Sequence, residues 1–289
     1  MSQIIISNIV MDIIGQLIKL TPEFRGKWRL IRYWMNHQND NTVKLRVLPG
    51  GEKVYCHLCI PYESMVYLER EEQTDLKLLT KLLEPGQTFV DCGANIGIWS
   101  LVAASRVGVE PSGKVYSFEP NPLTFKKLSE NVSLAKFKKN INLIASAVGN
   151  EEKSVLFHCD AAHNISHIVD SSNESSITVS VVTLDSIFNP HSLETNIVHG
   201  IKIDVEGFEM KCLQGCEGTL KRYNPWLCVE FNTLLAKVNK LSDWEVHHYL
   251  SELGYVCRKF EDALDSSTTS ILPDTWETTG YCNLYYSIK

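Results

Sequence analysis

The second part of the chain alternates between short apolar runs and stretches with helical periodicity. The apolar runs predict strands at 88–91, 114–118, 141–148, 198–205, 226–231, 255–260 and 281–287. The periodic stretches predict helices at 97–107, 122–136, 208–223 and 244–253. Such alternation favours a mostly parallel sheet with helices on both faces. No full crossover helix separates the last two strands, so we expect the last one to be antiparallel. The sequence therefore predicts an α/β fold with a seven-stranded sheet.

The first part of the chain follows a different pattern. Residues 1–20 predict an amphipathic helix, and residues 42–60 alternate around Pro49-Gly50-Gly51 as a hairpin does. A helix is predicted from Arg70 to Leu83. We interpret residues 1–66 as an extension and residues 67–289 as the main domain. The extension fits two uses, covering the core or forming the contact of a homo-oligomer.

Between residues 150 and 195 the alternation breaks. Two further strands are predicted there, at 153–159 and 177–182, on either side of a polar stretch from His163 to Ser176. We interpret this part as an insertion into the main domain.

A glycine turn follows the first strand of the alternation. Asp91, Gly93, Asn95 and Gly97 form a turn in which missing side chains let backbone N–H groups approach a ligand. Glu119 follows Gly97 by 22 residues, the distance at which an acid at a strand end accepts hydrogen bonds from a ribose. A nucleoside cofactor is therefore expected. Positions 93, 95 and 98 carry Gly, Asn and Ile rather than three glycines, which argues against a pyrophosphate and an NAD-dependent oxidoreductase.

The composition of the chain limits which binding partners and which cellular compartment we expect. The net charge of -6 and the pI near 5.9 argue against nucleic acid. Nine scattered cysteines favour a reducing, cytoplasmic compartment, and the Cys56-x-x-Cys59 pair lacks the second pair that a structural zinc needs. The apolar N-terminus lacks the features of a signal peptide and is shorter than a comfortable membrane span. Contact with a membrane surface, helped by Lys27, Arg29 and Arg32, stays an alternative use of it.

Three charged residues on a predicted central strand indicate where a functional site lies. Lys202, Asp204 and Glu206 share one parity of the strand at 198–205, where unpaired charges would cost several kcal/mol. They indicate a site, although a Lys202–Asp204 ion pair and a helix-start role for Glu206 would also account for them. The next strand ends with Glu230 and Asn232, which would lie beside this group if the two strands are neighbours.

Several segments together resemble one enzyme family. The D-x-G-x-N-x-G turn resembles motif I of class I S-adenosylmethionine-dependent methyltransferases, and FVDCGANIGIWS, YSFEPNP, AVGN, VTLDSI and IKIDVEGFEMKCLQG together resemble the FkbM family. The resemblance covers roughly residues 71–232 and implies the class I Rossmann-like fold with O-methylation of hydroxyl groups, often on sugars of glycans or glycosylated metabolites. By position, it assigns the cofactor to Asp91, Gly93, Ala94, Asn95, Gly97, Glu119, Pro120, Asn121, Ser146 and Ala147.

The same resemblance places Lys202, Asp204 and Glu206 at the reaction site. Glu230 joins the catalytic candidates through the expected pairing of the two strands, although a plain structural role would also account for it. Thr183 and Asp185 also match the family, but Asp185 fits a helix N-cap equally well. Ser146 stands where many methyltransferases carry an acid toward the adenine, so a hydroxyl or backbone group would have to substitute.

The expected reaction is a direct displacement in which an alcohol oxygen attacks the sulfonium methyl. Asp204 is the first candidate for the base, followed by Lys202 and by the histidines of the insertion, which are His158, His163 and His167. Asp204, Glu230 and Asn232 also resemble an oxygen ligand set for Mg²⁺. An N-methyltransferase would carry an Asn/Asp-Pro-Pro-Tyr/Phe segment where this chain has IDVEGF. A non-catalytic scaffold is the remaining alternative. Trp99 and Trp276 are candidates for stacking on a sugar.

Overall fold

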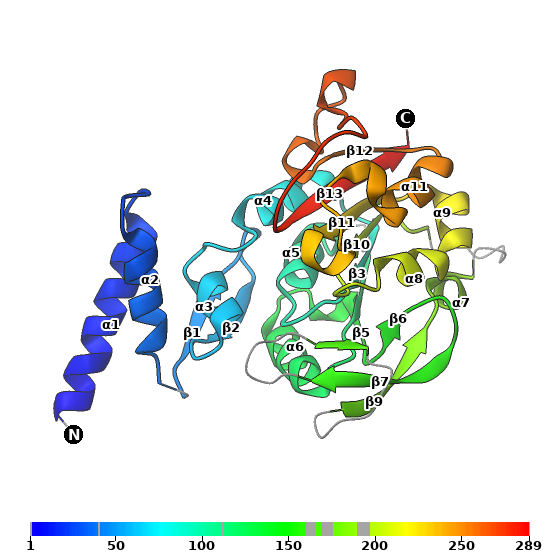
Figure 1. Ribbon diagram of the computed structural model, residues 1–289. Coiled ribbons are helices and arrows are strands. Elements are labelled where there is room, and N and C mark those ends of the chain that lie inside the picture. Colours follow the sequence, from blue (N-terminus) through cyan, green and yellow to red (C-terminus); the bar gives the residue numbers. More distant parts are fainter. Residues whose placement is uncertain are drawn as a thin grey trace.

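One large sheet forms the centre of the molecule. The computed structural model describes residues 2–39, 41–110, 113–159, 166–168, 176–189 and 197–288, and for residues 2–9, 158, 159 and 166–168 it describes the backbone alone. The seven-stranded sheet has the order β12 (Tyr255–Lys259), β13 (Tyr281–Ile288), β11 (Trp226–Asn232), β10 (Gly200–Ile203), β3 (Thr88–Cys92), β4 (Lys114–Phe118), β5 (Ile141–Ile144) (Figure 1). Only β13 runs antiparallel to its neighbours. This confirms the predicted sheet and its antiparallel last strand.

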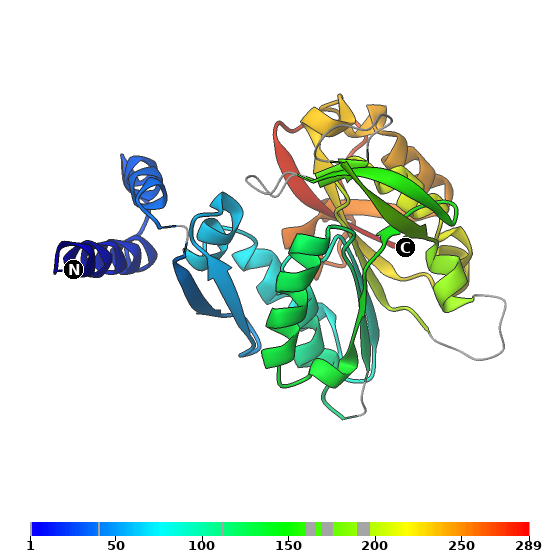
Figure 2. The same ribbon diagram turned by 90° about the horizontal axis from the view of Figure 1, so that it is seen from below.

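Helices cover both faces of this sheet, as predicted, and each layer has its own apolar cluster (Figures 1 and 2). One layer contains α4 (Gln73–Leu82), α5 (Ile98–Val107) and α6 (Pro122–Leu134). The other contains α7 (Leu184–Phe188), α8 (Glu209–Gln214), α9 (Glu217–Tyr223) and α11 (Glu245–Glu252). The short helical segments are α10 (Thr233–Ala236), η1 (Lys138–Asn140), η2 (Leu241–Asp243), η3 (Phe260–Asp262) and η4 (Thr268–Ser270).

Alternation along the central strands separates apolar from charged side chains. Ile201 and Ile203 of β10 pack into the cluster under α7, α8, α9 and α11. Lys202, between them, points to the opposite face, where its ammonium lies 5.5 Å from the centre of the Trp99 ring on α5. Asp91 of β3 pairs in register with Lys202. The strand period therefore brings one cation and one carboxylate together beneath α5.

The predicted strand at 141–148 is wrong as a single element. β5 ends at Ile144 in the main sheet, and β6 (Ala147–Val148) belongs to a second sheet. There β6 pairs with β9 (Ser176–Val182), followed by β7 (Lys153–Cys159) and β8 (Ser166–Ile168). Pairing with β9 turns the chain away from the main sheet at Ser146. Two of these strands confirm the ones predicted at 153–159 and 177–182.

The predicted helix at 208–223 is also wrong as a single element, because it breaks between α8 and α9 at Gly215-Cys216. A side chain at Gly215 would lie 1.8 Å from the carbonyl oxygen of Gly149. The break therefore lets the loop after β6 approach the helix backbone closely. Cys212 and Cys216 are both buried in the apolar cluster that contains α7, α8, α9 and α11.

The N-terminal extension consists of two helices, a hairpin and a third helix. These are α1 (Ser2–Leu20), α2 (Lys27–Asn36), β1 (Val43–Val47), β2 (Lys53–His57) and α3 (Pro61–Tyr67). The β1–β2 pair confirms the hairpin, whereas α2 and α3 were not predicted. Ile31 and Trp34 of α2 pack into the same cluster as α5, and the Trp34 indole donates to the Met11 carbonyl at 2.6 Å. The boundary after residue 66 stays a prediction.

One face of α1 and the turn after it are apolar and exposed, at Val10, Ile13, Leu17, Leu20 and Phe24. None of the helices in the described part of the chain has the length and apolarity to cross a bilayer. Lys27 cannot contribute to a membrane surface, because it is 1% exposed and its ammonium binds the carbonyls of Thr21 and Pro22. Membrane-surface and oligomer contacts of the extension stay predictions.

Candidate active site

The glycine turn after β3 is held in a conformation that requires glycine. Gly93 has φ +82°, and a Cβ there would lie 1.9 Å from the carbonyl oxygen of Asp204. Gly97, with φ +94°, precedes the first residue of α5. Because Gly93 has no side chain, the turn lies directly against the end of β10. The sequence pattern thus places the turn and Asp204 in contact.

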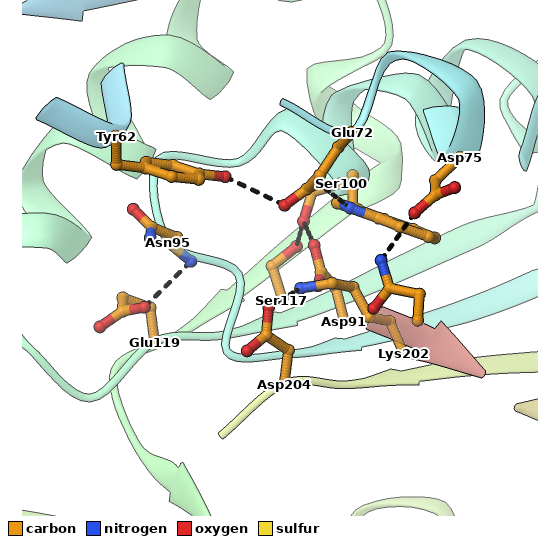
Figure 3. A network of polar contacts seen from close by, with 12 residues as sticks. Tyr62, Glu72, Asp75, Asp91, Asn95, Ser100, Ser117, Glu119, Lys202 and Asp204 are labelled. Carbon is orange, nitrogen blue, oxygen red and sulfur yellow. Dashed lines mark hydrogen bonds and ion pairs between the residues drawn. The ribbon is translucent and has the colours of Figure 1, made fainter. Parts of the chain in front are cut away.

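Glu119, at the end of β4, holds this turn from the other side. Its Oε2 accepts a hydrogen bond from the Asn95 backbone N–H at 3.0 Å (Figure 3). Its Oε1 accepts one from the Asn121 backbone N–H at 2.9 Å. Burial raises the pKa of Glu119 to about 7, and the two amide hydrogen bonds oppose the rise. The carboxyl is thus fixed in position beside the turn.

A cavity of about 350 Å³ opens at this edge of the sheet. Of the residues predicted for the cofactor, seven line it, which are Gly93, Ala94, Asn95, Glu119, Pro120, Ser146 and Ala147. Asp91, Gly97 and Asn121 are not among the lining residues and support the wall from behind. Ser146 lies in this wall with its hydroxyl 3.1 Å from that of Ser180. Among the charged side chains of the described lining, carboxyl groups outnumber cations. Six of them, Glu71, Glu72, Glu119, Asp204, Glu206 and Glu230, accompany a single cation, Lys202.

Lys202 connects the cavity with the core. Its Nζ lies 2.9 Å from Asp204 Oδ2 and 4.0 Å from Asp91 Oδ1 (Figure 3). Burial alone would lower the pKa of Lys202, but the carboxylates Asp204, Asp91 and Glu72 overcome it and hold that pKa well above its usual value. Lys202 therefore favours its cationic form, which argues against it as the base, and its role in the reaction stays a prediction.

Asp91 serves this arrangement from a fully buried position. Its Oδ2 accepts a hydrogen bond from the Ser100 hydroxyl at 2.6 Å, and Ser100 is 2.7 Å from the Ser117 hydroxyl. Burial raises the pKa of Asp91, whereas Lys202 and Ser100 lower it. The network ties β3, β4 and α5 together behind the glycine turn.

Sequence reasoning missed a second wall, which comes from the chain before β3. Glu72 precedes α4 with a left-handed φ of +55° and accepts hydrogen bonds from the Trp99 indole and, at 3.3 Å, from the Tyr62 hydroxyl (Figure 3). Burial raises its pKa to about 7, against the attraction of Lys202. The sequence offered no signal for Glu72, which reads as an ordinary acid at the start of a helix. Trp99 is 1% exposed and held by this bond, while Trp276 does not line the cavity.

β13 closes the same side of the cavity with two further residues that were missed. The Tyr281 hydroxyl donates to Glu71 Oε1 at 2.7 Å, and the Asn283 amide donates to Asp75 Oδ2 at 2.7 Å. Both side chains point from the antiparallel strand to the start of α4. Contacts of this kind join positions more than 200 residues apart, so no local pattern could reveal them.

Glu206 and Glu230 are acids with strongly raised pKa values. Burial, then Asp204 and Glu209, raises the pKa of Glu206 to about 7. Burial, then Asp204 and Glu206, raises that of Glu230 to about 9. β11 is the neighbour of β10, as predicted, so Glu230 stands beside Asp204. At neutral pH, Glu230 is therefore protonated and can donate a hydrogen bond.

The residues of the predicted magnesium set do not fit a magnesium ion. The Asn232 side-chain oxygen already accepts the N–H groups of Leu234 and Leu235 at the start of α10. Glu230 favours its neutral form, and no group of three His, Cys, Asp or Glu side chains suited to a metal occurs among the described residues. These three residues therefore do not form a magnesium site in the reaction proposed below.

The other candidates lie elsewhere. Thr183, rather than Asp185, is the N-cap of α7. The Asp185 carboxylate accepts the N–H groups of Gly218 and Thr219, both at 2.8 Å, and so joins α7 to α9. His163 lies outside the described residues, and the side chains of His158 and His167 are not described either. The proposed role of these histidines as bases stays a prediction.

Known proteins resemble this chain in the region that builds the cavity. A family model described as the methyltransferase FkbM domain matches residues 91–257, which is more than half of the chain. The chain belongs to the FkbM methyltransferase domain family. The α/β sheet described above is accordingly the class I fold that the sequence resemblance implied.

Individual relatives of this FkbM domain are distant. The hexuronic acid methyltransferase AglP of Haloferax volcanii is 29% identical over 156 residues, which span 54% of this chain and 60% of AglP. The structure of a methyltransferase FkbM from Methylobacillus flagellatus matches with a TM-score of 0.42 and 18% identity. The match covers 78% of this chain and 54% of the Methylobacillus chain. An O-methyltransferase from Thermotoga maritima has a TM-score of 0.44 and 14% identity, covering 85% and 78%.

Proposed function

We propose that this chain is an S-adenosylmethionine-dependent O-methyltransferase that acts on a hydroxyl group of a sugar. One observation carries the proposal: Asp204, paired with Lys202, faces the same cavity as the Gly93–Asn95 turn and Glu119. A proton acceptor and a nucleoside pocket thus meet at the carboxyl ends of adjacent strands, where open α/β sheets bind their ligands.

The wall residues fit the cofactor. Glu119 has each carboxyl oxygen beside a backbone N–H and can still accept hydrogen bonds from the two ribose hydroxyls. A cavity of about 350 Å³ is within the usual range for such ligands. Bound there, the cofactor would supply an electrophilic methyl group on a positively charged sulfur, and the surplus of carboxyl groups in the wall suits that charge.

Asp204 is the group that we assign to the proton of the acceptor. The bound cofactor would supply the methyl group and leave as a thioether, and the Asp204 carboxylate would accept the proton that the acceptor hydroxyl releases. The Lys202 ammonium binds one carboxylate oxygen of Asp204. The Asp204 side chain is 24% exposed and lines the cavity. Lys202 is thus a positioning residue, and the neutral Glu230 beside Asp204 can donate a hydrogen bond to the acceptor.

The sugar acceptor is supported by the name of one relative and by the polar wall. AglP is named for methyl transfer to a hexuronic acid, and it is 29% identical to this chain over 156 residues. The cavity offers Tyr62, Glu206, Glu230 and Tyr281 as hydrogen-bonding groups, a set that suits a polyhydroxy ligand better than an apolar one.

Two measurements test the proposal. Calorimetric titration with S-adenosylmethionine and with NADH decides which nucleoside binds, and we expect heat only from the former. Incubation with methyl-labelled S-adenosylmethionine and a panel of glycosides, with mass analysis of the products, should then show label on a sugar oxygen. Binding of NADH alone, or label only on nitrogen acceptors, would contradict the assignment.

A further inference from the structure

A second concavity lies beside the active-site cavity and shares two of its residues. It is a groove of about 620 Å³ between α2 and the main domain. Glu71 and Tyr281 line both the groove and the cavity, and the Tyr281 hydroxyl donates to Glu71 Oε1 at 2.7 Å. This bonded pair marks the border at which the two spaces meet. Figure 1 shows the start of β13 on the side of the sheet that faces the N-terminal elements.

The groove carries the opposite charge to the cavity. Three arginines line it, which are Arg29, Arg32 and Arg70, against a single acid, Glu71. Arg29 and Arg32 lie one helical turn apart on α2, are exposed, and form no ion pair with any residue that the structure describes. Arg70 is held in place by Glu23 and by the Ile18 carbonyl at 3.1 Å. Two guanidinium groups are therefore free to bind an anion from outside.

An aromatic surface accompanies these charges. Trp28 is 63% exposed and Tyr281 is 61% exposed, and both line the groove. Leaving a tryptophan side chain in water forgoes the burial of a large apolar area. A flat aromatic beside guanidinium groups is suited to the apolar face of a sugar ring that carries a negative charge.

We propose that this groove is the acceptor subsite, and that it selects an anionic saccharide, charged through a carboxylate or a phosphate. The inference rests on the proposed function. The anionic group binds Arg29 and Arg32, the ring packs on Trp28, and the reacting hydroxyl passes the Glu71–Tyr281 border to reach Asp204. An anion would be repelled by the carboxyl groups of the cavity, so this arrangement keeps the negative charge outside while the neutral hydroxyl enters.

Three matched ligands test the charge requirement by direct binding. They are p-nitrophenyl β-glucoside, the corresponding glucuronide and the glucoside 6-phosphate, which differ only at the sixth carbon. Calorimetry on the full chain, with and without S-adenosylhomocysteine, should show tighter binding of at least one anionic ligand by about tenfold, with weakening at high salt. Comparing the glucuronide with the phosphate identifies which anion the groove prefers.

Paired variants locate the effect in the groove. Arg29→Ala with Arg32→Ala should remove most of the preference, an effect of about tenfold or more, while binding of the neutral glucoside changes by less than about twofold. Arg29→Lys with Arg32→Lys should give an intermediate loss, because lysine keeps the charge without the bidentate fork. Arg25→Ala is the matched control, since Arg25 is exposed in the same extension but does not line the groove.

Each outcome decides the matter. Equal binding of the three ligands, absence of measurable binding of both anions, or an equal loss in the Arg25 variant would overturn the inference. Failure of S-adenosylmethionine to bind would instead defeat the proposed function, and the groove measurement without cofactor would be unaffected by it. If anionic lipid vesicles bind with the same dependence on Arg29 and Arg32 while the glycosides do not, the groove is not an acceptor subsite.

Discussion

The cavity and the groove meet at Glu71 and Tyr281 but differ in charge, in packing and in origin. The charged side chains in the described lining of the cavity are carboxyl groups apart from Lys202, and backbone hydrogen bonds fix one of them, Glu119. The groove is lined by arginines and by exposed aromatic side chains. Every lining residue of the groove lies outside residues 91–257, the part that matches the family, whereas most of the cavity wall lies within it.

Under the proposed function, this difference separates two tasks, which are cofactor binding and selection of the acceptor. A pocket for a cationic cofactor shared by a whole family is best built on the ends of sheet strands, where backbone geometry holds it. Selection of an acceptor can be added at the rim by elements such as α2 without disturbing that geometry. The comparison therefore predicts that substitutions in the cavity impair chemistry or cofactor binding, while substitutions in the groove change only the choice of acceptor.

The largest effect is expected at Asp204. Asp204→Asn keeps the shape of the side chain, and its amide oxygen can still accept a hydrogen bond from the Lys202 ammonium. Because the substitution removes the proton acceptor, kcat should fall by about 10² to 10⁴. Calorimetry should show S-adenosylmethionine affinity within about threefold of the unaltered protein. Asp243→Asn is the matched control, because Asp243 is exposed and does not line the cavity. Unchanged kcat would remove Asp204 from the reaction.

The second effect concerns the cofactor. Glu119→Gln replaces a carboxylate, whose two oxygens can accept hydrogen bonds from the ribose hydroxyls, by an amide in which one end is a donor. The affinity for S-adenosylmethionine and S-adenosylhomocysteine should therefore fall by about 10- to 100-fold. Both ligands should be affected alike, since both carry the ribose. Glu130→Gln, on the exposed side of α6, serves as the control. A selective loss of one ligand would show that Glu119 acts on the sulfur charge rather than on the ribose.

The sequence was sufficient for the parts of the fold that local periodicity determines. The strands around the glycine turn, the spacing to Glu119 and the charged parity of Lys202 and Asp204 could all be predicted, because each depends on one strand and its ends. The split at Ser146 could not, since it depends on β6 pairing with β9 rather than continuing β5.

The rest of the site depends on long-range packing. Tyr62, Glu72 and Tyr281 reach the cavity only because α3, α4 and β13 pack against the same end of the sheet. Glu72 stands at a left-handed backbone position, which residue type alone did not signal. The groove was beyond prediction for the same reason, because α2 itself was not foreseen.

A third prediction tests how far the cavity is strained by its own charges. Glu230→Gln should raise the free energy of unfolding of the free protein by about 4 kcal/mol at pH 8, with little gain at pH 4.5. Burial, and then Asp204 and Glu206, raise the pKa of Glu230 in the folded protein to about 9. At pH 8 the folded protein therefore keeps the Glu230 proton, which the unfolded chain releases near the ordinary pKa of a glutamate. The contribution of Glu230 to stability therefore falls as the pH rises between those two pKa values.

Urea unfolding at the two pH values measures this difference, with Glu245→Gln on the exposed face of α11 as the control. An equal gain at both pH values would show that packing rather than titration is responsible. A loss of stability at pH 8 would mean that Glu230 is ionised and paired in the folded protein, which would also make it a competitor of Asp204 for the acceptor proton.

The smallest effect separates the charge of the cofactor from its shape. Burial raises the pKa of Glu72 and Glu206 to about 7, so both carry protons at mildly acid pH. A sulfonium cation favours their ionised forms, whereas S-adenosylhomocysteine lacks that charge. The affinity ratio of the two ligands should therefore shift toward S-adenosylmethionine by about three- to fivefold between pH 5.5 and 7, if binding lowers one such pKa by about one unit.

The pH interval stays below the pKa of an ordinary α-amino group, so both ligands keep their ammonium charge and the ratio reports the sulfur alone. Glu206→Gln should flatten the dependence, while the groove variant with Arg29→Ala and Arg32→Ala should leave it unchanged. A ratio independent of pH would mean that the cavity acids do not sense the sulfonium. The contrast between an acidic cofactor cavity and a basic acceptor groove would then describe the surface of the protein but not its choice of ligands.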